Sequence, residues 1–369
     1  MTNGEVDYEG RVHRARDLME DRGLDAIYMN AGANMRYFTG YSTTSAGWPV
    51  WFSALLIPRE ADAVFLTNSM HRDIFEYTNT WVRDVRTHED GDDVRPQLRD
   101  TIRDTGLERG RIGVEGKAWL DDVDLLRGCA PDAEVHSARD LFDRLRIVKE
   151  PVELDAIRAA CQASVAGFRR ASDIAKPGAD GREVGAEVAA AMLEAGGEAA
   201  NTAFQLFAKR FAGRQLEAGD VIPLDIGTTV RGYQSDTART IFVGEAAPGH
   251  LELYDHLLRA RELAMAAVKP GTPVSEIHRI AAHEVAKSGY EQPWRIGHGI
   301  GLAPNHEPPY LQEGNDILIE PGMVFVIDPG THVEDERYDL PIAIEDAFHV
   351  TEDGIEWLTE FDTGPIVVR

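Results

Sequence analysis

The segment RIGHGIGLAPNHEPP, residues 295–309, holds two imidazole side chains in a stretch rich in glycine and proline. His298 lies between Gly297 and Gly299, and His306 follows eight residues later. Glycine removes neighbouring side chains and permits unusual backbone angles, so we expect His298 on an open loop where it can approach another group closely. Either histidine alone is compatible with an ordinary hydrogen-bonded or surface role. A functional role requires partner residues elsewhere in the chain.

Two aspartates lie on a predicted β-hairpin upstream of that segment. The stretch DVIPLDIGTTVRGYQSDTARTIFVG, residues 220–244, has two β-rich runs on either side of a polar turn. A turn centred on Val230 and Arg231 places Asp225 opposite Asp236, with Cβ atoms about 5 Å apart. Two carboxylates so close repel each other and require a cation or a shared proton. Val-Arg is not a favoured two-residue turn, so a longer loop or bulge, or two solvated aspartates, are the alternatives.

Two apolar segments further along the chain each contain an acidic residue. Asp328 follows the apolar run MVFVI and precedes Pro329, and Glu345 lies inside the run LPIAIEDAFHV. A charge in an apolar strand is costly unless it is paired or binds a metal. An aspartate before proline is also a common turn former, whereas that explanation fits Glu345 less well.

These residues together predict a metal centre. Four carboxylates and one imidazole form an oxygen-rich ligand set of the kind that holds a pair of Mn, Co, Fe or Zn ions. The five predicted ligands are Asp225, Asp236, His298, Asp328 and Glu345. His306 is then expected beside them as a catalytic or supporting group.

Two domains are expected to position these residues, because 369 residues exceed one ordinary core. Within residues 1–145, RVHRARDLMEDRG predicts a helix ended by Gly23, LDAIYM predicts a strand, and SALLIP with AVFLT predicts a hairpin. This α/β half contains no compact cluster of ligand types, and we assign it a substrate-gating or packing role. Residues 146–369 form the second domain, which opens with a long helix whose first turn contains Pro151.

The second domain contains an internal repeat. KPGADGREVGAEVAAAMLEAGGE, residues 176–198, aligns without gaps on KPGTPVSEIHRIAAHEVAKSGYE, residues 269–291, with seven identical positions. Both copies predict a turn followed by a helix that ends at glycine. Two unrelated helices with similar caps would also give part of this match. Because each copy precedes candidate ligands, we expect two related halves around a shared site.

The amino-acid composition limits the kinds of molecule that the protein is expected to bind. A formal net charge of −25 argues against nucleic acid, which is bound through clustered Lys and Arg. With 6 lysines against 32 arginines, the acidic surface resembles that of proteins from a salt-loaded cytoplasm, although an acidic mesophilic protein is the alternative. No run approaches the roughly 20 apolar residues of a membrane helix, and the polar start MTNGEVDYEG does not resemble a secretory signal. We therefore expect a cytoplasmic protein without membrane or nucleic-acid partners.

Four segments, in the family's order, resemble the ligand segments of the pita-bread metallopeptidases, which include methionine aminopeptidase, aminopeptidase P, prolidase and the related creatinase. They are LDIGTTVRGYQSDTART, GHGIGLAPNHEPP, EPGMVFVIDPG and IEDAFHVTEDG. GANMRYFTGY resembles the N-terminal domain of the prolidase and aminopeptidase P branch. The resemblance implies an α+β fold, with a pita-bread catalytic domain that has an internal pseudo-twofold repeat and follows an α/β creatinase-like domain.

The resemblance also implies an activity. The five predicted ligands would bind two divalent metal ions, Mn or Co in preference to Fe or Zn, with Asp236 and Glu345 bridging. His306 matches the histidine that stabilises the tetrahedral intermediate when a metal-bridging hydroxide attacks the peptide. This implies an Xaa-Pro dipeptidase or Xaa-Pro aminopeptidase that cleaves the bond before proline in a small peptide. A homodimer is implied as well, in which one subunit's N-terminal domain reaches its partner's site.

Three departures from the family pattern leave other activities open. Asp328 stands where the peptidases have the longer glutamate, which weakens metal contact there or removes one ion. The segment before the hairpin lacks the peptidases' substrate histidine and has Phe207, Lys209 and Arg210 instead, and Ala343 replaces an arginine of the prolidase branch. The alternatives are a creatinase-like or compatible-solute hydrolase, or a lyase, acting on a small C–N or sulfonium compound. A third possibility is a binding protein without catalytic activity.

Overall fold

The computed structural model describes residues 6–30, 32–41, 51–78, 81–199, 213–302, 306–334 and 339–369. The chain divides into two compact units, residues 5–146 and Ile147–Arg369. None of the described helices is both long and apolar enough to cross a membrane. The described residues do not include Phe207, Lys209 and Arg210, which stand in the segment where the peptidases have a substrate histidine.

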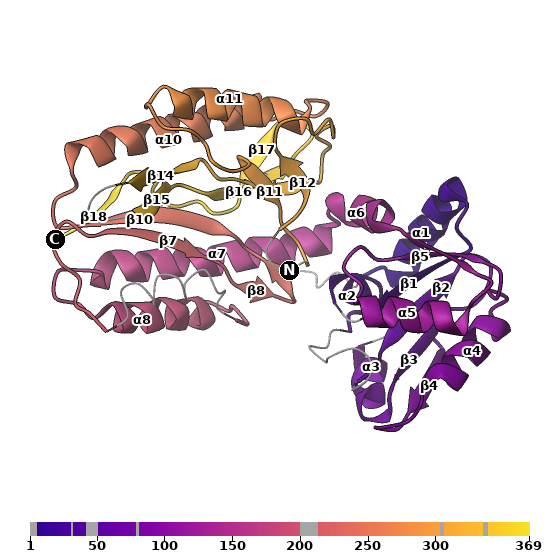
Figure 1. The fold of residues 1–369 in the computed structure, drawn as a ribbon. Coiled ribbons are helices and arrows are strands. Elements are labelled where there is room, and N and C mark those ends of the chain that lie inside the picture. The colour runs from indigo at the N-terminus through magenta and orange to yellow at the C-terminus, as the bar shows by residue number, and fades with distance from the viewer. Residues whose placement is uncertain are drawn as a thin grey trace. The chain divides into compact units, whose positions relative to one another are not determined.

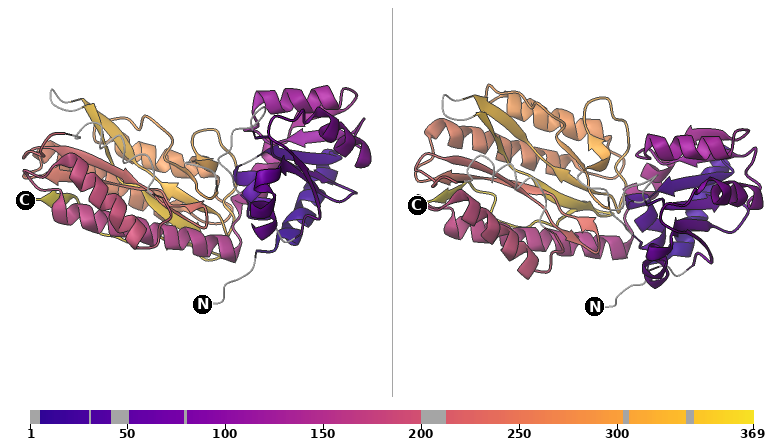
Figure 2. Two further views of the ribbon diagram at one scale, coloured as in Figure 1. Left: turned by 90° about the horizontal axis from the view of Figure 1, so that it is seen from below. Right: turned by 60° about the horizontal axis from the view of Figure 1, so that its bottom comes forward.

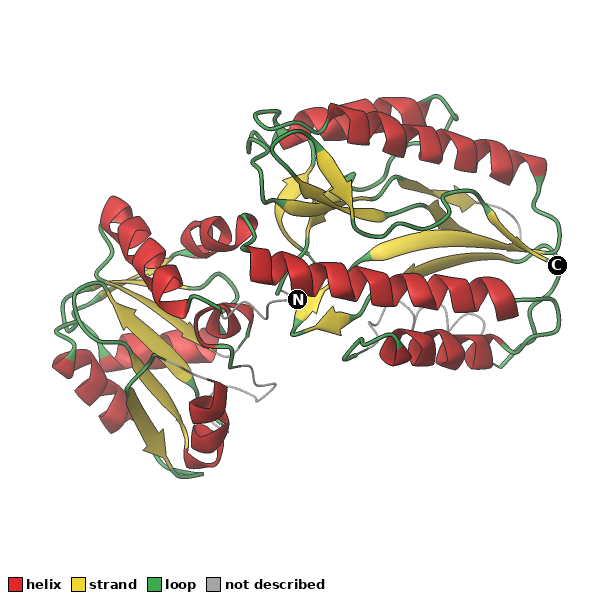
Figure 3. Ribbon diagram, turned by 180° about the vertical axis from the view of Figure 1, so that it is seen from behind, coloured by secondary structure: helices red, strands yellow, loops and turns green. Residues whose placement is uncertain are grey.

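The N-terminal unit is built on a six-stranded mixed sheet with the strand order β4-β3-β2-β1-β5-β6. All residues of β1, β2 and β3 are buried, which requires helices against both faces of the sheet (Figure 3). The elements are α1 (Tyr8–Arg22), β1 (Ala26–Asn30), α2 (Ala33–Thr39), β2 (Ala54–Pro58), β3 (Val64–Asn68), η1 (Ser69–His71), α3 (Arg72–Thr78), β4 (Asp84–His88), α4 (Arg95–Asp104), β5 (Arg111–Val114), α5 (Leu120–Cys129), β6 (Glu134–Ser137) and α6 (Arg139–Ile147).

The predicted elements of this unit are confirmed. Asp7 caps α1 by accepting a hydrogen bond from the Gly10 N–H, and Gly23 ends the helix with a left-handed φ of 61°. The two predicted hairpin strands are β2 and β3, which pair antiparallel.

The C-terminal unit places its strands between two pairs of helices. In Figure 1, α7 and α8 lie on one side of the strands and α10 and α11 on the other, and the views in Figure 2 show the same order. The elements are α7 (Pro151–Ile174), α8 (Gly181–Glu194), β7 (Val221–Ile226), β8 (Thr229–Val230), β9 (Tyr233–Gln234), β10 (Thr237–Val243), α10 (Pro248–Ala267), α11 (Val274–Ala286), β11 (Gly297–Gly299), β12 (Glu307–Leu311), β13 (Val324–Ile327), β14 (Gly330–Glu334), β15 (Asp339–Ala343), β16 (Asp346–Val350), β17 (Ile355–Trp357) and β18 (Ile366–Val368).

Each helix pair covers its own apolar core. The core under α7 and α8 includes Phe168 and Val188 and the inner residues of β7 and β10. The core under α10 and α11 includes Leu257 and Val285 together with strands β13 and β16. The strands between the two cores are therefore covered on both sides.

The internal repeat is confirmed by the helix boundaries. Helices α7 and α10 end at Ile174 and Ala267, which are 93 positions apart. Helices α8 and α11 begin at Gly181 and Val274, again 93 positions apart. The sequence repeat therefore corresponds to two related helix pairs, and the α+β pita-bread fold with a pseudo-twofold repeat is confirmed.

Candidate metal centre

All six residues predicted to form the site line one pocket of the C-terminal unit, with a volume of about 310 Å³. They come from β7, the segments before β10 and β12, strand β11, and the segments after β13 and β15. The pocket is lined by Pro223, Asp225, Asp236, Ala238, Arg239, Trp294, Arg295, His298, His306, Asp328, Ala343 and Glu345.

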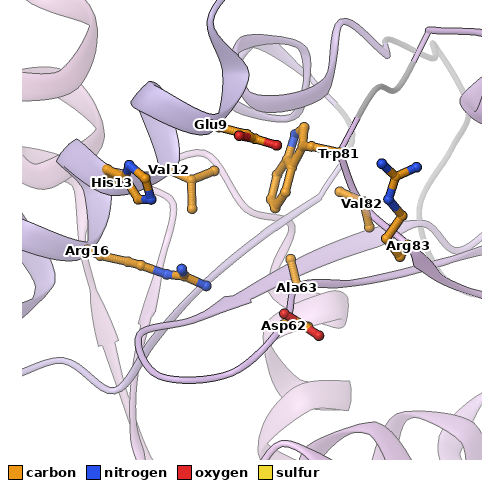
Figure 4. Close-up of a pocket in the computed structure, with 9 residues that line it drawn as sticks. All are labelled: Glu9, Val12, His13, Arg16, Asp62, Ala63, Trp81, Val82 and Arg83. Atoms are coloured by element: carbon orange, nitrogen blue, oxygen red, sulfur yellow. The ribbon is translucent and has the colours of Figure 1, made fainter.

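A second hollow, of about 240 Å³, lies in the N-terminal unit (Figure 4). Trp81, small apolar side chains and several acidic and basic side chains line it, and Arg16 donates hydrogen bonds to the backbone oxygens of Pro58 and Ala61. Arg16 thus ties α1 to the turn between β2 and β3, which is a structural role. Among the described residues, the groups of three or more His, Cys, Asp or Glu close enough to share a metal ion lie in the other unit.

The turn of the carboxylate hairpin differs from the predicted one. Strands β8 and β9 enclose Arg231 and Gly232, and not Val230 and Arg231. Arg231 and Gly232 have left-handed φ angles of 52° and 78°. Two such angles define the hairpin turn that favours glycine at its second position, so Gly232 was the signal that could have located it.

This turn moves the strand register by two residues. Asp225 pairs with Ala238, and the prediction that it faces Asp236 directly was wrong. Because side chains alternate between the faces of a strand, a shift of two residues leaves each on its predicted face. Asp236 is therefore a diagonal neighbour of Asp225 on the same face, and the two carboxylates still converge.

The potential ligand atoms form two close groups that share Asp236. Atoms of Asp225, Asp236 and Glu345 lie within 4.8 Å of one another, and so do atoms of Asp236, His298 and His306. His298 Nε2 lies 3.8 Å from Asp236 Oδ2 and 3.6 Å from Glu345 Oε1. Two neighbouring positions in the pocket are thus each surrounded by several ligand atoms.

The charge states of these groups suit a cation. Burial raises the pKa of Asp236, Asp328 and Glu345 well above the usual range, and the neighbouring carboxylates raise it further. The Asp225 side chain is open to solvent in the pocket, yet the protein atoms that crowd it raise its pKa to about 6. Burial and the adjacent His306 lower the pKa of His298 to about 3, so that its imidazole is neutral.

His298 does not lie on a loop, as the sequence had suggested, but at the centre of strand β11. This strand pairs with β12 on one side and β13 on the other. A Cβ atom at Gly297 would lie 2.0 Å from Val326 O, and one at Gly299 would lie 2.2 Å from Pro308 O. The glycines are therefore required because neighbouring strands approach closely, and not because the backbone angles are unusual.

The two imidazoles present different atoms to the pocket. His298 Nδ1 donates to Gly299 O at 3.1 Å, which leaves the Nε2 lone pair facing the carboxylates. Arg295 donates to His306 Nδ1, so in neutral His306 the proton is on Nε2, which lies 4.0 Å from Asp236 Oδ2. These tautomers are assigned from the hydrogen bonds. His298 is thus prepared to bind a metal, whereas His306 is prepared to donate a hydrogen bond.

Asp328 lies directly after β13, as predicted, and lines the same pocket. It belongs to neither of the two close groups of ligand atoms. Its Oδ2 instead accepts a hydrogen bond of 3.1 Å from Trp294 Nε1. Trp294 and Arg295 lie three and two positions before Gly297, and their proximity to the Gly-His-Gly strand was the signal that could have marked them as pocket residues.

The donor set fits divalent metal ions. Several buried carboxylates repel one another, and a neutral imidazole directs its lone pair among them. Such an arrangement is costly unless a cation compensates the negative charge. A mixed set of carboxylates and imidazole is suited to Mn, Co, Fe or Zn.

Comparison of this chain with known protein families agrees with the conclusion that the pocket suits divalent metal ions. The model of metallopeptidase family M24 matches residues 155–352, which include all the predicted ligands. This chain belongs to metallopeptidase family M24. The model of the creatinase/prolidase N-terminal domain matches residues 11–148 of the same chain.

Proteins similar to this M24 metallopeptidase include peptidases, and some of them align with nearly the whole chain. It is 27% identical to the Xaa-Pro dipeptidase of Lactobacillus helveticus over 95% of this chain and 97% of that protein. It is 35% identical to the probable dipeptidase PepE of Mycobacterium tuberculosis over 59% of this chain and 60% of that protein. The crystal structure of dipeptidase PepE from Mycobacterium ulcerans matches with a TM-score of 0.86 and 26% identity, covering 99% of this chain and 100% of that one.

A buried charge network supports Glu345 in this metallopeptidase. Glu345 is not inside a strand as predicted, but lies between β15 and β16 in an isolated bridge to Ala238. The adjacent Asp346 accepts hydrogen bonds from Arg239 at 2.8 Å and Arg261 at 2.6 Å, with all three side chains buried. Arg239 also donates to the Glu345 backbone oxygen at 2.9 Å. These contacts fix the backbone from which the Glu345 carboxylate projects.

A buried ion pair anchors the segment that carries His306. Lys149 Nζ lies 2.7 Å from Oε1 of Glu307, and their side chains are only 1% and 6% exposed. We expect Lys149→Ala to lower the free energy of unfolding by about 3–5 kcal/mol, because it removes one partner of a buried ion pair. Chemical denaturation of the two proteins measures this difference.

The matched control is Arg103→Ala. Arg103 pairs with Asp100 at 2.7 Å, but their side chains are 60% and 54% exposed. An exposed pair contributes only about 0–1 kcal/mol. Equal losses in the two variants would contradict a special role for the buried pair.

Proposed function

We propose that this metallopeptidase is an Xaa-Pro dipeptidase, which hydrolyses the bond before proline in a dipeptide. The main support is the convergence of four carboxylates and a neutral imidazole on one pocket. A relative named as an Xaa-Pro dipeptidase aligns over 95% of the chain. The alternative within the same reaction class is an Xaa-Pro aminopeptidase, which accepts longer peptides.

Two divalent ions, Mn or Co in preference to Fe or Zn, would be held by the five predicted ligands. Asp236 would contact both ions, because it belongs to both close groups of ligand atoms, and Glu345 is the second bridging residue we propose. Bound metal supplies Lewis acidity for the carbonyl group and lowers the pKa of water. The remaining ligands are Asp225, His298 and Asp328.

The side chains around the ligands would handle the peptide. The Nε2–H of His306 faces the pocket and would donate a hydrogen bond to the carbonyl oxygen as it becomes negative. Pro223, Trp294 and Ala343 give the wall an apolar part against which a prolyl ring would pack. Ala343 leaves room where the prolidase branch carries arginine, and this keeps a small-molecule substrate as the second candidate.

The test is a measurement of bound metal per subunit followed by a substrate panel. We expect about two ions per chain and turnover of Xaa-Pro dipeptides, with Xaa-Ala dipeptides as the matched control. Xaa-Pro-Xaa tripeptides separate a dipeptidase from an aminopeptidase. Turnover of creatine-like or solute-like compounds alone would reject the peptidase proposal in favour of the second candidate.

We propose that a second copy of this chain covers an exposed apolar stripe on η1 and α3. Met70, Ile74 and Tyr77 follow one another at helical spacing and are 68%, 54% and 92% exposed. Ile74→Glu is expected to shift the protein from dimer to monomer in light scattering after gel filtration. Leu193→Glu, on an exposed position of α8, is the control and should leave the dimer intact. A wild-type monomer at micromolar concentration would contradict this proposal.

The gating role of the N-terminal unit and the cytoplasmic location stay predictions. Cys129 and Cys161 are both free and buried. This is compatible with a reducing compartment, where disulfides are rare.

A further inference from the structure

Trp294 contacts both the backbone and the side chain of Asp328. Its indole Nε1 lies 3.1 Å from Asp328 Oδ2 and 3.3 Å from the Asp328 backbone oxygen. One N–H group is thus shared between two oxygens of the same residue. Such a contact fixes the direction of the carboxylate relative to its own backbone.

The position of the indole ring is itself fixed. A Cβ atom on Gly330 would lie 2.6 Å from Trp294 Cζ2, so the ring packs directly on the chain at that residue. Gln292 links the same two segments, because its amide donates to Asp328 O and its Oε1 accepts from the Gly330 N–H at 3.0 Å. The Asp328 N–H in turn donates to Ile296 O at 2.7 Å. Trp294 therefore lies in a part of the pocket wall that several hydrogen bonds tie to the segment after β13.

Orientation matters more for Asp328 than for the other acids of the pocket. An aspartate is one methylene, about 1.5 Å, shorter than the glutamate that the family resemblance places here. Its carboxylate belongs to neither close group of ligand atoms. A short side chain at the edge of the centre has few rotamers that direct an oxygen inward, and a wrong rotamer removes it as a ligand.

We infer that Trp294 is a positioning residue that holds Asp328 as a metal ligand by engaging Oδ2, so that Oδ1 is directed toward the metal. This inference rests on the proposed metal centre. Groups that hydrogen-bond to a metal ligand orient it and tune its basicity, and their loss typically weakens metal binding about 10–100-fold. Trp294 thus offsets the shorter reach of Asp328.

The experiment measures metal binding to the full-length protein without peptide. After removal of metal by a chelator, Mn²⁺ and Co²⁺ are titrated by calorimetry into wild type and Trp294→Phe. We expect Trp294→Phe to bind one of the two ions about 10–100-fold more weakly, and the visible spectrum of bound Co²⁺ to change. Trp294→Leu, whose side chain is apolar and has no hydrogen-bond donor, serves if Trp294→Phe unfolds.

Trp81→Phe is the matched control. The Trp81 indole also donates a hydrogen bond, to Phe38 O at 2.7 Å, but in the N-terminal unit. This variant is expected to bind both ions as wild type does. A loss in Trp81→Phe equal to that in Trp294→Phe would overturn the inference.

A double variant that carries both Asp328→Ala and Trp294→Phe distinguishes a positioning role of Trp294 from a general effect on the fold. If Trp294 acts through Asp328, adding Trp294→Phe to Asp328→Ala produces no further loss of affinity. An undiminished loss in that background, or unchanged binding in Trp294→Phe alone, would overturn the inference. Failure of the peptidase assay with normal metal binding would reject the proposed function and leave this inference intact.

Discussion

An Asp236→Asn variant is expected to lose one or both metal ions and nearly all peptidase activity. Asp236 is the residue common to both close groups of ligand atoms, and asparagine removes its negative charge with little change in volume. Metal provides several kcal/mol of transition-state stabilisation, so kcat/KM should fall at least about 10²–10³-fold. Elemental analysis of bound metal and steady-state kinetics measure the two losses separately.

The same substitution should make the metal-free protein more stable. Burial and the nearby Asp225 and Asp328 make a charged Asp236 unfavourable, which is why its pKa is raised. Removing the charge relieves this repulsion when no cation compensates it. We therefore expect chelator-treated Asp236→Asn to melt at a higher temperature than chelator-treated wild type, and to gain less from added Mn²⁺.

Asp316→Asn, at an exposed position, is the control for the change in net charge. It should leave metal content and activity unchanged. Full metal content and full activity in Asp236→Asn would contradict the proposed site as a whole. A lower melting temperature of the metal-free variant would contradict the repulsion argument alone.

Replacement of His306 by alanine is expected to lower kcat while leaving metal content unchanged. Its Nε2–H faces the pocket because Arg295 donates to Nδ1. Removal of one donor to a developing oxyanion typically costs about 10²–10³-fold in kcat. The side chain is 43% exposed, so its loss should barely affect the free energy of unfolding.

His136→Ala is the control for this variant, since His136 is exposed and lies in the N-terminal unit. The expected result is wild-type kinetics. His306 Nε2 also lies close enough to Asp236 and His298 to share a metal ion with them. Loss of one ion in His306→Ala would therefore contradict the donor role and make His306 a ligand.

The sequence alone predicted the elements and the chemical types of the site. Periodic apolar residues and glycines located α1 and its end at Gly23, because helix geometry and left-handed caps are local properties. The repeat located α8 and α11 at matching positions. An isolated acid in an apolar segment, as at Glu345, indicated a buried charge because such a charge requires compensation.

Only the tertiary structure decided how those residues meet. The register of the hairpin depended on the turn at Arg231 and Gly232, and the predicted pairing was two residues away from the observed one. His298 was expected on a loop because the sequence does not reveal which strands approach its two glycines.

Several contacts that support the pocket join residues far apart in the sequence. Lys149 pairs with a glutamate 158 positions away, and Trp294 holds Asp328 from 34 positions away. The tautomer of each histidine follows from which neighbour its other ring nitrogen contacts. Local sequence fixes composition, caps and periodicity, whereas hydrogen bonds between distant segments form only after both have been placed by the packed cores, and these bonds determine the chemistry of the pocket.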